Sequence, residues 1–425
     1  MSQWLTQVID DAKRVDDFLA PMRQQALLKL QTQGWPHARS EEWRFTPLSS
    51  VKERLIDASA VASNSSIASH YEVPQIEGLN AIDLVFVDGL LVTDLSSISF
   101  PSGLSVYALS DAPSEVHSKI TSLFGHVKPA RHVFGLVNDA LCQQGIYVDV
   151  DENATIDTPL RIVNLATKDC DAHTRVLVNL GKQSQLKVIE HGSGSAASFT
   201  TAFAEYVIGE KASLEHYRFA LFTGAAKQVG GSHFSLQHSA NLNSTLVSYG
   251  SELSRLDVDI IHAGEHANAK MNAIYLLAEG EFFDLHSTIE HAVPNGTTEE
   301  NARGIIGDRA RAVFSGRIHI HRDAQKTLAE LNNRNLLLSR RAMINTKPEL
   351  EIYADDVKCA HGATVAEIEE KALYYLLSRG IKRSKALVML NFGFIQELVN
   401  AVDDESIRTW LLPLLSERFA SMEVK

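Results

Sequence analysis

The sequence contains little cysteine, and this scarcity excludes one class of protein. Its 425 residues include only Cys142, Cys170 and Cys359. An odd number of cysteines at such wide spacing predicts no disulfide framework. It favours a reducing compartment, in which a thiol stays free for metal or sulfur chemistry. We therefore expect a cytoplasmic protein.

The sequence also lacks a surplus of basic residues, a signal peptide and a long apolar run. The formal net charge is −12, which argues against nucleic acid and anionic lipid as partners. The N-terminal residues contain no basic stretch followed by an apolar one. The best apolar run, residues 81–91, is interrupted by Asp83, Asp88 and Gly89, so no membrane span is expected. An acidic chain of this kind suits protein partners.

Residues 1–80 have the apolar spacing of helices and are predicted to form an N-terminal helical domain. The recurrence of apolar residues from Trp4 to Leu19 predicts one helix, which Pro21 ends. A second helix is expected before Gly34.

Residues 363–425 are predicted to form a C-terminal helical domain. Thr364 and Glu367 have the spacing of a capping box, which predicts that a helix starts there. Another helix is expected after Asp404, with a bend at Pro413.

Between these ends, residues 81–362 alternate apolar and polar side chains with the period of a β-strand. A short pattern recurs there: an apolar pair, Gly-x-x-(Ala/Ser), one spacer and another apolar residue. We interpret each instance as a strand, a tight corner and the next strand. The glycine would supply backbone freedom, and the small residue would let the next coil stack closely. Such units predict a mainly β fold with a β-helix core, although a β-sandwich stays open because Gly-x-x-Ala is common in β proteins. The instances are Gly181–Ser184, Gly209–Ala212, Gly264–Ala267 and Gly307–Ala310.

Cys359 and His361 form the sharpest local feature. In an extended chain, residues two apart point to the same face, so a thiolate and an imidazole would meet there. Lys358 beside them would favour the thiolate. Two ligands are too few for a closed site, since iron–sulfur clusters typically use four, and the others would come from elsewhere in the chain or from a partner. The alternative is a buried cysteine and a structural histidine near a domain junction.

His319 and His321 are a second pair with the spacing of one strand face. Two imidazoles at this spacing can hold a metal when a carboxylate joins them, as in barrel-type oxygenases. Arg317 and Arg322 flank the pair and would repel a cation, and we expect no carboxylate to be positioned nearby. A polar strand face is therefore favoured. A metal-dependent β-fold enzyme using His319 and His321 is the alternative from another class.

No stretch predicts nucleotide binding or independent catalysis. Residues 191–195 read His-Gly-Ser-Gly-Ser. They lack the Gly-Lys-Ser/Thr ending of a P-loop, so no ATP is expected on this chain. No nucleophile elbow and no paired catalytic carboxylates stand out. We predict a non-catalytic protein.

Two stretches carry motifs in a distinctive order. Residues 324–394 contain, in sequence, AQKT, NLLLS, PELEI, ADDVKCAHGAT, YYLLSRGI and GF, and residues 41–48 read EEWRFTPL. These stretches resemble the SufB/SufD family of iron–sulfur cluster assembly scaffold proteins. The Cys-x-His-Gly-Ala-Thr form at Cys359 and the motif at 41–48 resemble the SufD branch, whereas SufB proteins tend to have Glu-His-Glu-Ala-Thr. Ala360, where serine is frequent, is a minor departure.

The resemblance implies a right-handed parallel β-helix between helical domains and a non-catalytic place in the SUF system. It implies a heterodimer with SufB, and binding of the ATPase SufC through C-terminal helices, with Leu387, Leu390 and Phe394 as candidate contacts. Cys359 and His361 would lie at the SufB interface and help to build a transient iron–sulfur cluster. ATP would be held by SufC, and whether flavin binds the whole complex stays open. A SufB-like subunit or a homodimeric scaffold is the alternative within the family.

Overall fold

Two large sheets form the centre of the protein, whose computed structural model describes residues 3–57, 71–367 and 370–422. Sheet A contains β1 (Ile82–Val87), β2 (Leu90–Leu91), β5 (Leu160–Ala166), β7 (Gln185–Gly194), β9 (Ser213–Phe222), β11 (Asn241–Tyr249), β13 (Asn268–Leu277), β15 (Thr297–Ile306), β17 (Leu328–Leu337) and β19 (Lys358–Glu367). Sheet B contains β3 (Leu104–Ala108), β4 (Gln144–Val150), β6 (Asp171–Leu180), β8 (Phe199–Ile208), β10 (Lys227–Leu236), β12 (Leu253–His262), β14 (Phe282–His291), β16 (Arg311–Ile320) and β18 (Met343–Ile352).

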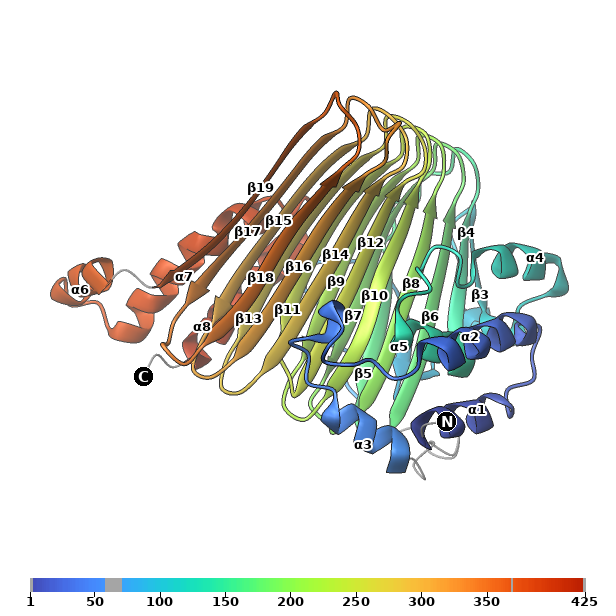
Figure 1. The fold of residues 1–425 in the computed structure, drawn as a ribbon, viewed down its shortest axis with the longest axis horizontal. Helices are drawn as coiled ribbons and strands as arrows, with labels where there is room; N and C mark the ends of the chain where they lie inside the picture. The colour runs from blue at the N-terminus through green and yellow to red at the C-terminus, as the bar shows by residue number, and fades with distance from the viewer. Residues whose placement is uncertain (1–2, 58–70, 368–369, 423–425) are drawn as a thin grey trace.

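From β4 onward, successive strands alternate between the two sheets, so the chain winds as a solenoid (Figure 1). Strands two apart in sequence pair in parallel; the antiparallel pairs are β1–β2 and β3–β4. The predicted parallel β-helix is confirmed. The open β-sandwich alternative is excluded, since sandwiches are built from antiparallel sheets.

Inward side chains stack in register from one coil to the next. Leu256, Leu285 and Phe314 hold the same place on β12, β14 and β16, and each is fully buried. Burying a side chain of this size contributes about 1.5–3 kcal/mol. Because each coil is covered by the coils before and after it, the stack buries a core that one coil could not.

The corners between coils confirm that the small residue lets the next coil stack closely. They correct the prediction that the glycine supplies backbone freedom. Ala212 is fully buried under the next coil. Gly209, however, does not have a positive φ; the left-handed residue of that corner is Lys211, with φ 56°. Gly209 is needed for space, because a Cβ atom there would lie 2.5 Å from the carbonyl oxygen of Leu180. The corresponding left-handed residues of the other three corners are Gln183, His266 and Asp308.

The N-terminal helices differ from their predicted bounds. The single helix predicted from Trp4 to Leu19 is wrong: the first helix ends at Ala12, and Pro21 lies in the first turn of the next. Proline is tolerated there because the first turn has no carbonyl partner for its missing N–H. The helices that precede β4 in the chain are α1 (Gln3–Ala12), α2 (Ala20–Gln33), η1 (Glu41–Trp43), α3 (Ser49–Asp57), η2 (Leu95–Ser97), η3 (Leu109–Asp111), α4 (Ser114–Leu123) and α5 (Val133–Leu141).

Helices α4 and α5 interrupt the region that the sequence predicted as strands. Helix α5 lies on the outward face of sheet B with α1 and α2 nearby (Figure 1). Phe134 packs there against Phe199 of β8, with ring centroids 5.9 Å apart. Almost every residue of α5 is buried, so its sequence lacks the polar stripe that marks a surface helix.

The C-terminal helices are α6 (Glu370–Ser378), α7 (Arg383–Asn400) and α8 (Glu405–Ser421). Helices α7 and α8 cover the outward face of sheet A through an apolar cluster, and α6 packs against α7. The predicted cap of the last helix is confirmed, since the Asp404 side chain accepts a hydrogen bond from the Ile407 N–H. The predicted capping box is wrong, because Thr364 and Glu367 belong to β19, where pairing with β17 holds the chain extended. No helix that the structure describes has the length and apolar character to span a bilayer.

Glu300 places a carboxyl group inside the solenoid. Glu300 of β15 is 1% exposed, and the Ser287 hydroxyl donates a 2.6 Å hydrogen bond to its Oε1 atom. Burial raises the pKa of Glu300 to about 7. The folded protein therefore holds this group protonated at pH values where the unfolded chain would ionise it.

The crowded corner at Gly209 should tolerate an added methyl group far less than the open corner at Gly307. We expect Gly209→Ala to lower the free energy of unfolding by about 1–3 kcal/mol, since backbone must shift. Gly307→Ala is the matched control, because its Cβ atom would meet nothing closer than 3.4 Å. Urea denaturation followed by circular dichroism measures both. Equal midpoints for the two variants would contradict this account of the corners.

Glu300 should make the solenoid less stable as pH rises. Its raised folded-state pKa means that its stabilising contribution is complete below about pH 4.5 and is lost as pH rises through 7. We expect Glu300→Gln to gain stability relative to the parent protein between pH 5 and 8. Urea denaturation midpoints of both proteins at pH 5 and pH 8 test this. A difference between the two proteins that does not change with pH would disprove it.

Candidate functional site

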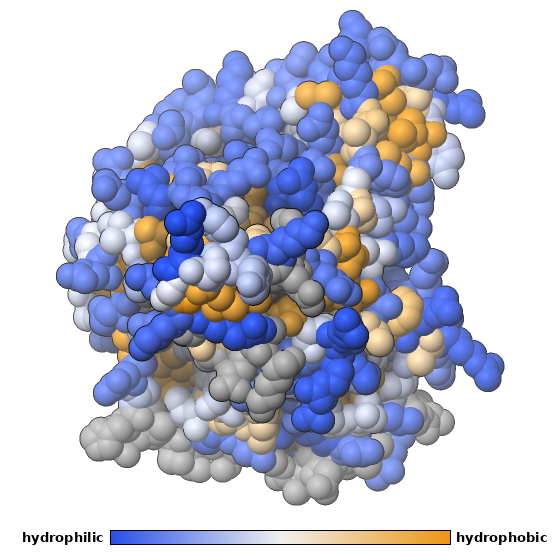
Figure 2. All heavy atoms as spheres, turned by 90° about the vertical axis from the view of Figure 1, so that its left-hand side faces the viewer, coloured by the Kyte–Doolittle hydropathy of each residue, from blue (hydrophilic) through white to orange (hydrophobic). Residues whose placement is uncertain are grey.

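The last coil, formed by β18 and β19, lacks the cover that every earlier coil receives. Within the described ranges, no strand pairs beyond these two edge strands. Neither strand contains a buried residue, whereas β16, one coil earlier, buries most of its side chains. Apolar side chains break the polar surface in the view onto this end of the molecule (Figure 2). The open end therefore presents core-type side chains at the surface.

Cys359 and His361 both project from this last coil toward the solenoid axis. They pair in register with Ala329 and Leu331 of β17, which belong to the central core. The predicted same-face arrangement of thiol and imidazole is therefore present. Cys359 is partly buried against the core, and His361 is exposed. Both groups are reached from the open end.

The environment of Cys359 corrects one electrostatic prediction. Burial raises the pKa of its thiol, and a hydrogen bond with the backbone of Ala329 opposes that rise. Lys358 alternates to the opposite face of the strand and does not lower the pKa. Cys359 is thus held mainly as a thiol until a metal or another group removes the proton.

His319 and His321 lie close together, with ring centroids 4.7 Å apart. The expectation of no nearby carboxylate is wrong. Glu351 Oε2 lies 2.7 Å from His319 Nδ1, and Glu290 Oε1 lies 2.5 Å from His321 Nε2. Both carboxylates come from neighbouring coils, through the pairing of β14, β16 and β18. Both carboxylates could have been found by searching the sequence about one coil length, roughly thirty residues, before and after each histidine.

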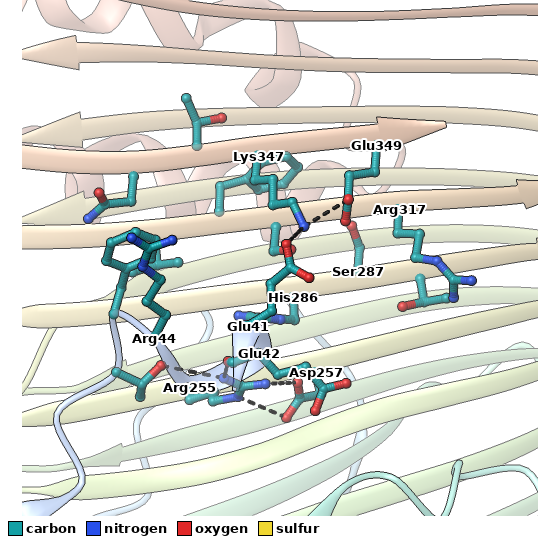
Figure 3. Close-up of a pocket in the computed structure, with 18 of the residues that line it drawn as sticks. Glu41, Glu42, Arg44, Arg255, Asp257, His286, Ser287, Arg317, Lys347 and Glu349 are labelled. Carbon is teal, nitrogen blue, oxygen red and sulfur yellow. Dashed lines mark hydrogen bonds and ion pairs between the residues drawn. The ribbon is translucent and has the colours of Figure 1, made fainter. Parts of the chain in front are cut away.

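The motif at residues 41–48 forms one wall of a hollow of about 710 Å³ on the outward face of sheet B (Figure 3). Trp43 is buried beneath the Arg255 guanidinium, whose carbon lies 3.8 Å from the ring centroid. The Thr46 hydroxyl donates a 2.5 Å hydrogen bond to Asp284. Glu41 forms an ion pair with Lys347 across the hollow. The motif thereby fixes the N-terminal segment onto the solenoid.

Two protein-family models match this chain. A family model described as the SUF system FeS cluster assembly SufBD core domain matches residues 163–394, and one for the SufBD N-terminal region matches residues 6–162. The chain belongs to the SufBD family. The solenoid and its open end are therefore features of an iron–sulfur cluster assembly protein.

Curated relatives of this SufBD protein span nearly its whole length. The iron–sulfur cluster assembly protein SufD of Escherichia coli K12 is 29% identical over 406 residues, 94% of this chain and 93% of its own. A SufBD family protein of Synechocystis is 28% identical, covering 95% of this chain and 92% of its own. The chloroplast protein ABCI7 of Arabidopsis thaliana is 27% identical, covering 88% and 80%. The chain is a SufD-like member of the family.

The predicted contact residues on the C-terminal helices of the SufBD protein differ in exposure. Leu387 is 7% exposed and packs between α6 and α7, and Leu390 is partly buried against the same cluster. Phe394 is partly buried against sheet A's outer cluster. The side chains that stand free on these helices include Tyr374 and Met389, at 74% and 49% exposure. Leu387 therefore holds the two helices together.

Cys359 should be the reactive thiol of the folded protein. Cys142 and Cys170 are buried, and burial raises their pKa values to about 12 and about 11. We expect iodoacetamide to modify one thiol rapidly at pH 8, and Cys359→Ser to remove that phase. Cys170→Ser, the matched control, should leave it intact. Mass spectrometry measures the rates, and equal rates for all three thiols without denaturant would rule out this assignment.

Proposed function

We propose that this chain is a non-catalytic scaffold subunit of a SUF complex in the cytoplasm, which pairs with SufB and binds the ATPase SufC. In this proposal, Cys359 and His361 complete a transient cluster-building site whose other ligands belong to SufB. The uncovered last coil is the observation that carries the proposal. A thiol and an imidazole stand there on the face that only another molecule could cover.

The physical argument for a partner is the free energy of the open end. Solenoids normally need terminal repeats with a polar outer face, because the apolar interior of the last coil would otherwise be exposed to water. Here Ile344, Leu350 and Val357 pack against the core but stay partly exposed. The edge strands β18 and β19 also offer unpaired backbone groups, which a strand of another chain could pair. Covering this end would bury apolar surface and satisfy hydrogen bonds together.

The identity of the partner rests on the number of ligands. Cys359 and His361 supply two, and iron–sulfur clusters generally use four. Among the described residues of this chain, no third cysteine, histidine or carboxylate joins them. A partner of the same family, stacked end to end, would bring its own ligands to the same seam.

The ATPase would act through the helices that follow β19. Helices α6 and α7 lie at the same end of the molecule as the last coil (Figure 1). Tyr374, Tyr375 and Met389 give them exposed apolar surface, which suits a protein partner. Leu390 and Phe394 lie partly exposed beside them. Binding energy differing between two states of the ATPase would shift these helices and the adjoining strand.

One rival function meets a specific difficulty, and the other uses the interface proposed for SufB. His319 and His321 are each engaged by a carboxylate from a separate coil, and among the described residues they form no group of three converging ligand atoms. This disfavours the metal-dependent enzyme. The homodimeric scaffold uses the same open end, so it competes with SufB for it. We expect the isolated chain to dimerise and SufB to displace the second copy.

Replacing either proposed ligand should abolish cluster formation while leaving the complex intact. We expect Cys359→Ser and His361→Gln, each co-expressed with SufB and SufC and purified without oxygen, to contain at least about tenfold less iron and sulfide, since metal sites lose that much even when supporting groups are removed. Iron and sulfide analysis and visible absorption measure the cluster.

Two variants serve as matched controls for this experiment. Cys170→Ser removes a buried thiol and His321→Gln an exposed imidazole, and both should retain cluster and partners. Unchanged cluster content in both Cys359→Ser and His361→Gln would remove these residues from the mechanism. Failure of the parent chain to co-purify with SufB would refute the partner assignment.

A further inference from the structure

Two imidazoles and one carboxylate meet beneath the hollow on sheet B, at β10 and β12, which lie three and more strands from the last coil. His132 stands at the start of α5, while His233 and Asp259 are register partners on β10 and β12. Asp259 Oδ2 lies 2.7 Å from His132 Nε2 and 2.7 Å from His233 Nδ1. Ligand atoms from the three residues lie within 4.8 Å of one another. Atoms bound to one ion at about 2.1 Å lie roughly 3–4 Å apart, so small rotations would suffice.

We propose that His132, His233 and Asp259 bind a divalent first-row transition ion, such as Fe(II) or Zn(II), as a two-histidine, one-carboxylate site. Such a set leaves coordination positions open for water or an exchanging ligand. The site would hold a metal ion on this chain independently of any partner subunit. It does not rest on the role proposed for Cys359 and His361.

The outer nitrogens of the two rings are placed to receive the displaced protons. In the hydrogen-bonded state, each ring points one nitrogen at Asp259. Binding a metal there would move each proton to the other ring nitrogen. His132 Nδ1 lies 3.7 Å from the Asp257 carboxylate, which Arg255 holds by hydrogen bonds. This is the arrangement in which a second carboxylate orients a metal-bound histidine. His233 Nε2 is buried and has no hydrogen-bond partner, so a proton moved there would lack an acceptor, a cost that the bonds to the metal would have to offset.

The hollow gives an ion access to the cluster. His132, Asp257 and Asp259 line it, and the Asp259 side chain keeps 11% exposure. Figure 3 shows Asp257 and His286 on the floor and Glu41 and Glu42 in the wall above them. Arg255 pairs with Asp257 and Lys347 with Glu41 there, so these carboxylates are already compensated and the hollow supplies a route rather than an attraction.

Arg131 is the group that opposes metal binding. Its guanidinium forms an ion pair with Asp259 and also donates a 3.0 Å hydrogen bond to the Thr288 hydroxyl. Its side chain is 36% exposed and lies near Glu42, so it can leave Asp259. Lys128 is the other cation near His233, and burial lowers its pKa to about 7, which reduces its charge. Removing the arginine charge should therefore strengthen the site.

Cobalt(II) is a suitable probe because its visible spectrum reports the ligands. The full-length chain carrying Cys359→Ser and His361→Gln removes the ligands at the last coil from the measurement. We expect equilibrium dialysis to give about one Co(II) per chain, displaced by Fe(II) or Zn(II) but not by Mg²⁺, with bands typical of nitrogen and oxygen ligands. Asp259→Asn should weaken binding at least tenfold, and His238→Gln, at an exposed histidine on a corner, should not change it.

Arg131→Gln distinguishes a metal site from a structural hydrogen-bond network. A metal site predicts tighter Co(II) binding in this variant, by about tenfold. A purely structural network predicts no stoichiometric binding in either protein. The proposal is overturned by absence of saturable binding, by binding that survives Asp259→Asn, or by an affinity that Arg131→Gln leaves unchanged or lowers. Because Arg131 lies at the surface, this test holds even if Asp259→Asn fails to fold.

Discussion

In-register stacking of parallel strands is the interaction on which the rest of this structure depends. Each inward side chain is covered by the residue one coil further on, as Leu256, Leu285 and Phe314 illustrate. The same rule leaves the final coil uncovered, since no further strand of the described chain pairs with β18 or β19 beyond it. The position of Cys359 and His361 is a consequence: any residue on the inward side of the last strand must face a partner or water. The proposed sharing of a site between subunits would follow from a solenoid whose last described coil leaves its core uncovered.

The sequence predicted features set by local periodicity and missed those set by the stacking of coils. Strand alternation and the buried small residues, such as Ala212, followed from spacing alone. The reason for Gly209 did not, because the carbonyl of Leu180 that crowds it lies in the preceding coil. Glu351 escaped notice beside His319 for the same reason. The capping box at Thr364 failed because ten residues of ladder pairing outweigh a local helix signal. A motif argument about a solenoid therefore has to search one coil away as well as two residues away.

The helices that cover the two sheets limit where outward polar side chains can stay open to solvent. Helix α5 and its neighbours cover part of sheet B, and α7 and α8 cover sheet A. Outward polar residues under these layers must find partners, because an unpaired buried charge costs several kcal/mol. Asp139 meets Arg175 and Lys128 in this way. Where the helical cover stops, the hollow forms. The cluster around Asp259 lies at that margin, buried enough to fix its geometry and open enough to admit an ion.

The attachment of the C-terminal helices explains how a distant partner could influence the last coil. Strand β19 pairs on one side only, with β17, so it has half the hydrogen bonds of an interior strand. Helix α6 begins three residues after β19 ends, while α7 contacts β13 and β15, and Arg303 of β15 lies 3.6 Å from Glu397 of α7. A force on α7 would therefore act on well-anchored strands, which resist it, whereas a force on α6 would act on an edge strand of the sheet. Because Cys359 and His361 lie on that strand, motion of α6 would change their exposure before it disturbed the core.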